Sequence, residues 1–137
     1  MNAEVLASVE SSLLRVTINR PEKRNPLSRA VLARLQEVFE SQRGNDALVL
    51  AVLSGAGDRS FAAGGDLRDL EQVRTPEQAR ALYDLGHGAF QAIRTFPVPV
   101  VAALNGLALG GGAELAVACD VRIAAAHARI GFVQGTL

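Results

Sequence analysis

The sequence lacks several features that would assign a protein to a simple class. Its 137 residues include a single cysteine, Cys119, which excludes an internal disulfide framework and suits a reducing compartment. The 14 basic and 14 acidic residues give a formal net charge of zero and are scattered along the chain, which argues against a nucleic-acid-binding surface. The first ten residues carry acids and no apolar segment typical of a signal peptide. We therefore expect a cytoplasmic protein with no nucleic-acid partner.

One apolar stretch, residues 97–119, is long enough to cross a lipid bilayer. However, it contains two prolines, several glycines and the carboxylate of Glu114. A carboxylate inside the hydrocarbon layer is energetically expensive, and the glycines would interrupt a helix. We therefore interpret this stretch as part of a folded core and expect no membrane partner.

The spacing of the hydrophobic residues, which make up 49% of the chain, predicts alternating strands and helices. Strands are expected at residues 5–9, 13–19, 47–53, 98–104, 121–125 and 129–132. Helices are expected after Ser28, after Thr75 and over residues 113–119, and glycine-rich loops over residues 54–66 and 105–112. This alternation indicates an α/β fold in one domain, with mostly parallel strand pairing.

Two of the expected helices have clear start signals. Ser28 is a candidate N-cap, and Thr75 begins a capping box with Pro76 at the first helical position and Gln78 at the third. The apolar face of the first helix contains Val31, Leu32, Leu35, Val38 and Phe39. In the second helix we expect a buried stripe made of Ala79, Leu82, Tyr83, Gly86, Phe90 and Ile93.

The two glycine-rich loops occur in the same context, because each follows a buried strand and leads into a helix. Neither has the spacing of a dinucleotide-binding motif, and neither has the lysine of a phosphate-binding P-loop. Glycines in such loops can simply make tight turns. Alternatively, the backbone amides of Gly64–Gly65 and Gly110–Gly112 could approach a ligand closely and stabilise a negative charge on it.

Glu114 is the only charged residue between Thr95 and Cys119. We expect a buried carboxylate in the first turn of a helix, where desolvation and the helix N-terminus act on it in opposite directions. Such a group suits proton transfer. The alternative is a structural carboxylate that caps its own helix or pairs with Arg122.

Other chemistries have weaker support. His87 and His127 are far apart with no cluster of acids nearby, so we expect surface histidines and no metal site. Cys119 is expected to be a small core residue.

Three segments together resemble the crotonase, or enoyl-CoA hydratase/isomerase, family. They are NRPEKRNPLS (residues 19–28), LSGAGDRSFAAGGDL (residues 53–67) and NGLALGGGAELAVACD (residues 105–120). The resemblance implies a spiral of ββα units and an acyl-CoA thioester substrate, with coenzyme A as part of the substrate and no separate cofactor. It also implies catalysis by Glu114 as acid/base and an oxyanion hole formed by the amides of Gly65 and Gly111.

The resemblance extends to the groups that would bind the substrate. The loop from Lys23 to Leu27 would lie along the coenzyme A moiety, and the segment from Ala63 to Arg68 would line the path of the pantetheine and the thioester. The expected substrate-binding residues are Lys23, Arg24, Pro26, Leu27, Ala63, Gly65, Asp66, Leu67, Arg68, Gly110 and Gln134.

Two features depart from the family's pattern. Gln134 stands about twenty residues after Glu114, where hydratases of the family carry a second glutamate, and Pro26 replaces a smaller residue. An amide cannot take a proton from water, so double-bond migration or decarboxylation through the same enolate competes with hydration. A non-catalytic acyl-CoA-binding or assembly subunit is a further alternative.

A further departure is length, because members of the family are about twice as long as this chain. We therefore expect residues 1–137 to be the N-terminal part of a crotonase-like acyl-CoA-binding domain, with the C-terminal helical part missing. The resemblance implies a homotrimer or a dimer of trimers for the full-length protein.

Overall fold

The three central strands of the larger of two sheets carry buried and more exposed side chains in alternation. In the computed structural model, which describes residues 3–136, this sheet has the strand order β1-β2-β3-β5-β7. The strands are β1 (Val5–Glu10), β2 (Leu13–Ile18), β3 (Leu50–Gly55), β5 (Val100–Leu104) and β7 (Val121–Ala124). Strand β1 pairs antiparallel with β2, and the other three pairs are parallel. The expected parallel pairing is therefore confirmed.

A second, smaller sheet consists of three short parallel strands, β4 (Ser60–Ala62), β6 (Leu107–Leu109) and β8 (Ile130–Gly131). From β3 onward, each strand of the large sheet is followed along the chain by a strand of the small sheet and then by a helix or a 3-10 turn. The sequence analysis placed β4 and β6 within loops, which is wrong. Strands of two or three residues are too short to show the alternation by which a strand is recognised.

The helices are α1 (Arg29–Gln42), α2 (Leu67–Glu71), α3 (Pro76–Arg94) and α4 (Gly111–Ala118), with short 3-10 turns at Pro21–Lys23 and Val133–Thr136. The predicted helix starts are confirmed. Ser28 Oγ accepts a hydrogen bond from Val31 N–H, and Thr75 and Gln78 form the full capping box. Helix α2, which the sequence analysis did not predict, has only five residues and begins after Asp66 as N-cap.

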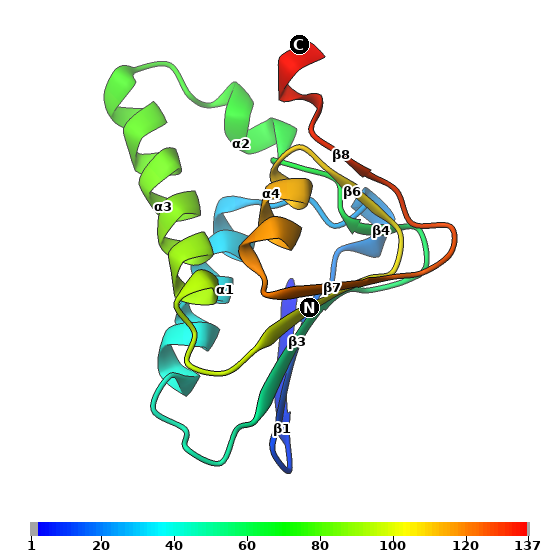
Figure 1. The fold of residues 1–137 in the computed structure, drawn as a ribbon. Coiled ribbons are helices and arrows are strands. Elements are labelled where there is room, and N and C mark those ends of the chain that lie inside the picture. The colour runs from blue at the N-terminus through cyan, green and yellow to red at the C-terminus, as the bar shows by residue number, and fades with distance from the viewer. Residues whose placement is uncertain (1–2, 137) are drawn as a thin grey trace.

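The core lies between the large sheet and the helices that cover it, with α1 and α3 packed side by side (Figure 1). The predicted apolar face of α1 is confirmed, because all five of its expected residues are buried. Phe39 on α1 and Phe96 after α3 make an edge-to-face pair with ring centroids 5.1 Å apart, a favourable aromatic geometry. Helix α4 lies between α3 and the small sheet (Figure 1).

The predicted buried stripe of α3 is largely wrong. Of its six residues only Ile93 is buried, whereas Ala79 and Tyr83 are exposed. The residues of α3 that are buried are Ala89, Ala92 and Ile93, all near its C-terminal end. The first half of α3 therefore presents an apolar face that the described residues do not cover.

The long apolar stretch at residues 97–119 is divided among β5, β6 and α4. Within residues 3–136, no helix has the length and apolar character needed to cross a membrane.

Candidate active site

Two glycine-containing loops meet because β4 and β6 are neighbours in the small sheet. Gly65 follows β4, and Gly111 is the first residue of α4 after β6. A methyl group built on Gly111 would lie 3.8 Å from the amide nitrogen of Gly65 and 3.6 Å from Leu27 Cδ1. Gly64 has a φ angle of +110°, a left-handed conformation that side-chain-bearing residues rarely adopt. The backbones of the two loops therefore lie close to each other.

The amides of Gly65 and Gly111 have no hydrogen-bond acceptor within residues 3–136. Their neighbours are paired: Leu27 N–H donates to Gly64 O at 2.7 Å, and Gly110 N–H donates to Gly131 O at 2.9 Å. Unpaired N–H donors that lie close together, one of them at a helix N-terminus, are the kind of groups that can stabilise a negatively charged oxygen.

Glu114 lies in the first turn of α4, as predicted, but its side chain is exposed in the described part of the chain. The expectation of a buried carboxylate is therefore wrong, because the apolar residues around it in sequence face the other side of α4. The proposed pairing with Arg122 is also wrong: Arg122 Nη1 donates to the carbonyl oxygens of Ala116 and Cys119, at 3.3 Å and 3.0 Å. Glu114 Oε1 instead accepts a hydrogen bond of 2.6 Å from Gln134 Nε2.

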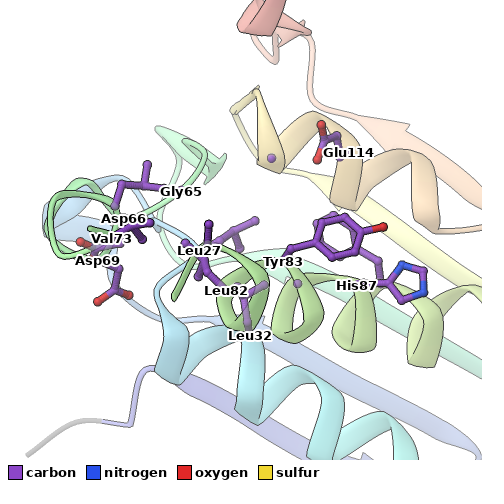
Figure 2. A pocket seen from close by; sticks show the side chains of 15 residues that line it. Leu27, Leu32, Gly65, Asp66, Asp69, Val73, Leu82, Tyr83, His87 and Glu114 are labelled. Atoms are coloured by element: carbon purple, nitrogen blue, oxygen red, sulfur yellow. The ribbon is translucent and has the colours of Figure 1, made fainter. Parts of the chain in front are cut away.

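Gly65, Gly111 and Glu114 all line one cavity of about 670 Å³. Figure 2 shows Glu114 on α4 and the aromatic side chains of Tyr83 and His87 on the neighbouring α3. Most of the remaining lining is apolar, namely Leu27, Leu32, Leu70, Val73, Ala79, Leu82 and Phe90. The exposed face of α3 thus lines a pocket. This explains why that face of the helix is apolar although it is not buried in the core.

A second cavity of about 350 Å³ lies beside the first and shares Gly65 and Asp66 with it. It is lined by Lys23, Pro26, Ala63, Gly65, Asp66, Leu67 and Arg68. These are seven of the eleven residues expected to bind the substrate, although they come from two segments about forty residues apart. Of the other four, Leu27 lines the larger cavity and Gln134 contacts Glu114. Arg24 and Gly110 line neither cavity, and Gly110 is the N-cap of α4.

The loop before α1 is held in place by a buried asparagine that the sequence analysis did not single out. Asn25 Nδ2 donates to the carbonyl oxygens of Ala56 and Ser60, and Asn25 Oδ1 accepts from Arg20 N–H. Arg24 and Asn25 both have φ angles in the left-handed region, at 64° and 53°. Asparagine tolerates this region better than most residues. An Asn before a Pro in a polar loop was therefore the sequence signal that could have indicated the structural role of Asn25.

An ion pair connects this loop to the second cavity. Arg20 Nη1 lies 2.9 Å from Asp66 Oδ2, and the side chains are 13% and 11% exposed. Burial acts to raise the pKa of Asp66. However, hydrogen bonds from Arg20 and from the backbone N–H groups of Arg68 and Asp69 outweigh it, so the pKa of Asp66 lies below its usual value. Asp66 is therefore ionised, and its ion pair with Arg20 holds in place a residue that lines both cavities.

The sequence analysis did not place Tyr83 and His87 near the glycine loops, yet both line the larger cavity with Glu114. Their rings are stacked, with centroids 5.7 Å apart and an interplanar angle of 14°. The sequence signal that could have identified them as cavity-lining residues is a tyrosine and a histidine one turn apart on an otherwise apolar helical face. His127, the other histidine, contacts the carbonyl oxygens of Asp58 and Asn105 through Nε2.

Cys119 is buried, as expected, and its thiol donates to Leu115 O at 3.5 Å. Burial, together with the nearby charge of Asp120, raises the pKa of Cys119 to about 12. The thiol is therefore protonated and poorly nucleophilic.

Comparison with known proteins is consistent with the residues that meet at this site. The family model described as enoyl-CoA hydratase/isomerase matches residues 8–136. The chain belongs to this family. The short-chain-enoyl-CoA hydratase of Clostridium acetobutylicum is 42% identical over 128 residues, which are 93% of this chain and 48% of that protein. The crotonyl-CoA hydratase of Syntrophomonas wolfei is 38% identical, with the same two shares of 93% and 48%.

The fold is confirmed by solved structures of the family. An enoyl-CoA hydratase from Bacillus anthracis superposes with a TM-score of 0.92 at 34% identity, over 97% of this chain and 52% of that one. The expected crotonase-like α/β fold is therefore correct. The chain spans about half the length of the curated relatives it matches.

Proposed function

We propose that this chain forms part of an acyl-CoA enzyme that hydrates or isomerises an enoyl-CoA through a thioester enolate. The observation that carries the proposal is the pair of unpaired amides at Gly65 and Gly111, which line the same cavity as the carboxylate of Glu114. Enolate formation moves negative charge onto the thioester oxygen, and two preorganised N–H donors stabilise that charge in the transition state. A carboxylate that lines the same cavity can move the proton.

The two cavities suit the two parts of an acyl-CoA. The smaller one carries the cations of Lys23 and Arg68, which can pair with the phosphates of coenzyme A. The larger one has a mostly apolar lining, which suits an acyl chain. The cavities meet at Gly65, so a thioester bound across the junction would place its oxygen at the two free amides.

The test compares Glu114→Gln with Glu77→Gln in the full-length natural protein. Glu77 is also an exposed glutamate in the first turn of a helix, but it lines neither cavity. Turnover would be measured with crotonyl-CoA, a 3-enoyl-CoA and a malonyl-type CoA, and binding by calorimetry. We expect Glu114→Gln to bind a CoA ester and to lose turnover by roughly 10²- to 10⁴-fold, as removal of a general acid/base does. We expect Glu77→Gln to match the natural protein.

Each failure has a separate meaning. Full activity of Glu114→Gln would exclude Glu114 as the acid/base. Turnover of the malonyl-type ester alone would indicate decarboxylation through the same enolate. Binding of CoA esters without turnover of any of the three would favour a non-catalytic acyl-CoA-binding subunit. Absence of CoA-ester binding would refute the proposal altogether.

We further propose, from the family resemblance, that the full-length protein is a cytoplasmic homotrimer or dimer of trimers. Sedimentation equilibrium of the purified protein tests the assembly, and a monomeric mass would contradict it.

A further inference from the structure

The two glycines that precede Asp66 need restraint from outside their own segment. Glycine adopts conformations that other residues avoid, so a Gly-Gly sequence by itself fixes the direction of its N–H groups only weakly. In the proposed function the N–H of Gly65 donates to the thioester oxygen, and such a donor is effective when it already points at that oxygen before the charge develops. The neighbours of Gly64 and Gly65 therefore decide how well this donor works.

One restraint acts on the peptide bond itself. Leu27 N–H donates to Gly64 O at 2.7 Å, and Leu27 pairs with Gly65 in a parallel β-bridge; Leu27 and Gly65 are both labelled in Figure 2. A trans peptide group is planar, so its C=O and its N–H point in opposite directions. The hydrogen bond to Gly64 O therefore also fixes the direction of the Gly65 N–H.

The second restraint holds the residue that follows. Asp66 Oδ2 accepts a hydrogen bond of 2.9 Å from Arg20 Nη1, and Asp66 Oδ1 accepts one of 2.9 Å from the N–H of Arg68. Hydrogen bonds between charged groups are stronger than those between neutral groups. Without Arg20, the carboxylate of Asp66 would keep only hydrogen bonds from its own segment. Gly65 would then be restrained on one side only.

Both restraints come from the loop that carries Lys23 and Pro26, which line the smaller cavity. The backbone of Arg20 closes this loop. Its carbonyl oxygen accepts from the N–H groups of Lys23 and Asn25 at 3.0 Å and 2.9 Å, and its N–H donates to Asn25 Oδ1 at 2.8 Å. Arg20 therefore contacts the smaller cavity's loop through its backbone and the residue next to Gly65 through its side chain.

The guanidinium group of Arg20 is also held from its other side. Arg20 Nε lies 3.6 Å from Glu4 Oε1, and Glu4 Oε2 accepts a hydrogen bond of 3.0 Å from Ser28 Oγ. A planar guanidinium presents several N–H donors in fixed directions and can bridge two carboxylates, whereas lysine offers a single ammonium group. The geometry thus uses arginine specifically, and not only a positive charge, at position 20.

We propose that Arg20 is a positioning residue that couples binding of the coenzyme A nucleotide to the oxyanion hole. When the phosphates pair with the cation of Lys23, the loop becomes ordered, and Arg20 transmits this order through Asp66 to the N–H of Gly65. Binding energy from a remote part of the substrate is then used at the reacting centre, where it raises turnover as well as affinity. The inference rests on the proposed function.

The test uses acetoacetyl-CoA, which loses a proton from C2 and forms an enolate with charge on the thioester oxygen. Acetoacetyl-pantetheine carries the same thioester without the nucleotide and its phosphates. The ratio of enolate to keto form in the bound ligand would be measured by near-ultraviolet absorbance, at neutral pH and saturating ligand. Calorimetry with butyryl-CoA, which forms no such enolate, would measure binding alone.

The full-length natural protein would be compared with Arg20→Gln, Arg20→Lys and the control Arg34→Gln. Arg34 also has a partner at 2.9 Å, Glu37, but this pair is exposed on α1 and Arg34 lines neither cavity. The control therefore removes an arginine and an ion pair of the same length without changing the loop before α1.

In the natural protein and in Arg34→Gln, removal of the nucleotide should lower the ratio of enolate to keto form about tenfold, less than the complete loss of an oxyanion donor. Arg20→Gln should show the lower ratio already with acetoacetyl-CoA, and removal of the nucleotide should change it by less than about twofold, because the coupling is lost. Arg20→Lys should lower the ratio at least about threefold, since it keeps the charge without the fork of donors.

Three results would overturn the inference and leave the proposed function intact. The first is an enolate ratio in Arg20→Gln equal to that of the natural protein. The second is an equal effect of nucleotide removal in these two proteins, and the third is a ratio in the natural protein that does not depend on the nucleotide. If Arg20→Gln does not fold, the same comparisons apply to Arg20→Lys. Failure of both CoA esters to bind the natural protein, or binding of acetoacetyl-CoA without any enolate, would instead refute the proposed function.

Discussion

Replacement of Gly112 by alanine tests whether the close packing of α4 against β4 holds the site together. Gly112 is the second residue of α4 and is buried. A Cβ atom at this position would lie 1.9 Å from Ala62 O, 2.7 Å from Ala62 C and 3.0 Å from Ala62 Cβ. Ordinary carbon–oxygen contacts are about 3.3 Å or longer. The start of α4 would therefore have to move away from β4 by more than about 1 Å.

The displacement should affect both stability and activity. Extra atoms forced into a packed core typically cost about 1–3 kcal/mol of unfolding free energy, and here the obstacle is backbone that no side-chain rotation can clear. The same shift would separate the amide of Gly111 from that of Gly65 and move Glu114. A displacement of about 1 Å at a reacting centre can lower turnover about a hundredfold.

Gly86→Ala provides the matched control. Gly86 lies inside α3, and a Cβ there would have nothing within 4 Å. Alanine in a helix interior is favoured over glycine by about 0.5–1 kcal/mol, so this variant should be more stable than the natural protein. Unfolding in guanidinium, followed by circular dichroism, would give the midpoint for each full-length variant. A midpoint for Gly112→Ala equal to or above that of the natural protein would refute the reasoning.

Two further predictions follow from the ionisable groups. The pKa of Asp66 lies below its usual value although burial acts to raise it, so its stabilising effect is present above about pH 4 and is lost as the pH falls through the native-state pKa. Asp66→Asn should therefore lower the unfolding free energy by about 1–3 kcal/mol at pH 7, measured by guanidinium unfolding, and a difference that persisted unchanged at pH 2–3 would contradict this. Cys119, whose pKa is raised to about 12 by burial and by nearby Asp120, should resist alkylation by iodoacetamide at pH 8 and react only after unfolding; mass spectrometry of the native protein would reveal any labelling that disproves this.

The sequence predicted those elements whose signals are local. The caps at Ser28 and Thr75 and the apolar face of α1 depend on residues that are close to each other in sequence, so they could be predicted directly. The second cavity could be predicted only through the family motifs, because Lys23 and Arg68 meet through tertiary contacts. Neither periodicity nor composition indicates which loops of a sheet become neighbours.

The main errors share one physical cause. An apolar helical face predicts contact with apolar groups, but it does not show whether those groups belong to the protein core or to a ligand in a cavity. Tyr83 and the apolar residues before it line the cavity, which is why α3 was assigned a stripe that is not buried. Glu114 was expected to be buried because its sequence neighbours are apolar. In a helix, however, residues next to each other in sequence face different directions, and Leu115 is buried while Glu114 is exposed.

The arrangement of the site follows from the small sheet, in which three successive units contribute one strand each. The loop after β4 supplies Gly65, the segment after β6 supplies Gly111 and Glu114, and the turn after β8 supplies Gln134. Parallel pairing places the ends of these strands at one edge, and a shift of one residue in the pairing of β6 with β8 would move Gln134 by roughly 3.3 Å, more than its hydrogen bond to Glu114 can span. Three successive units of the fold thus meet around the Glu114 side chain.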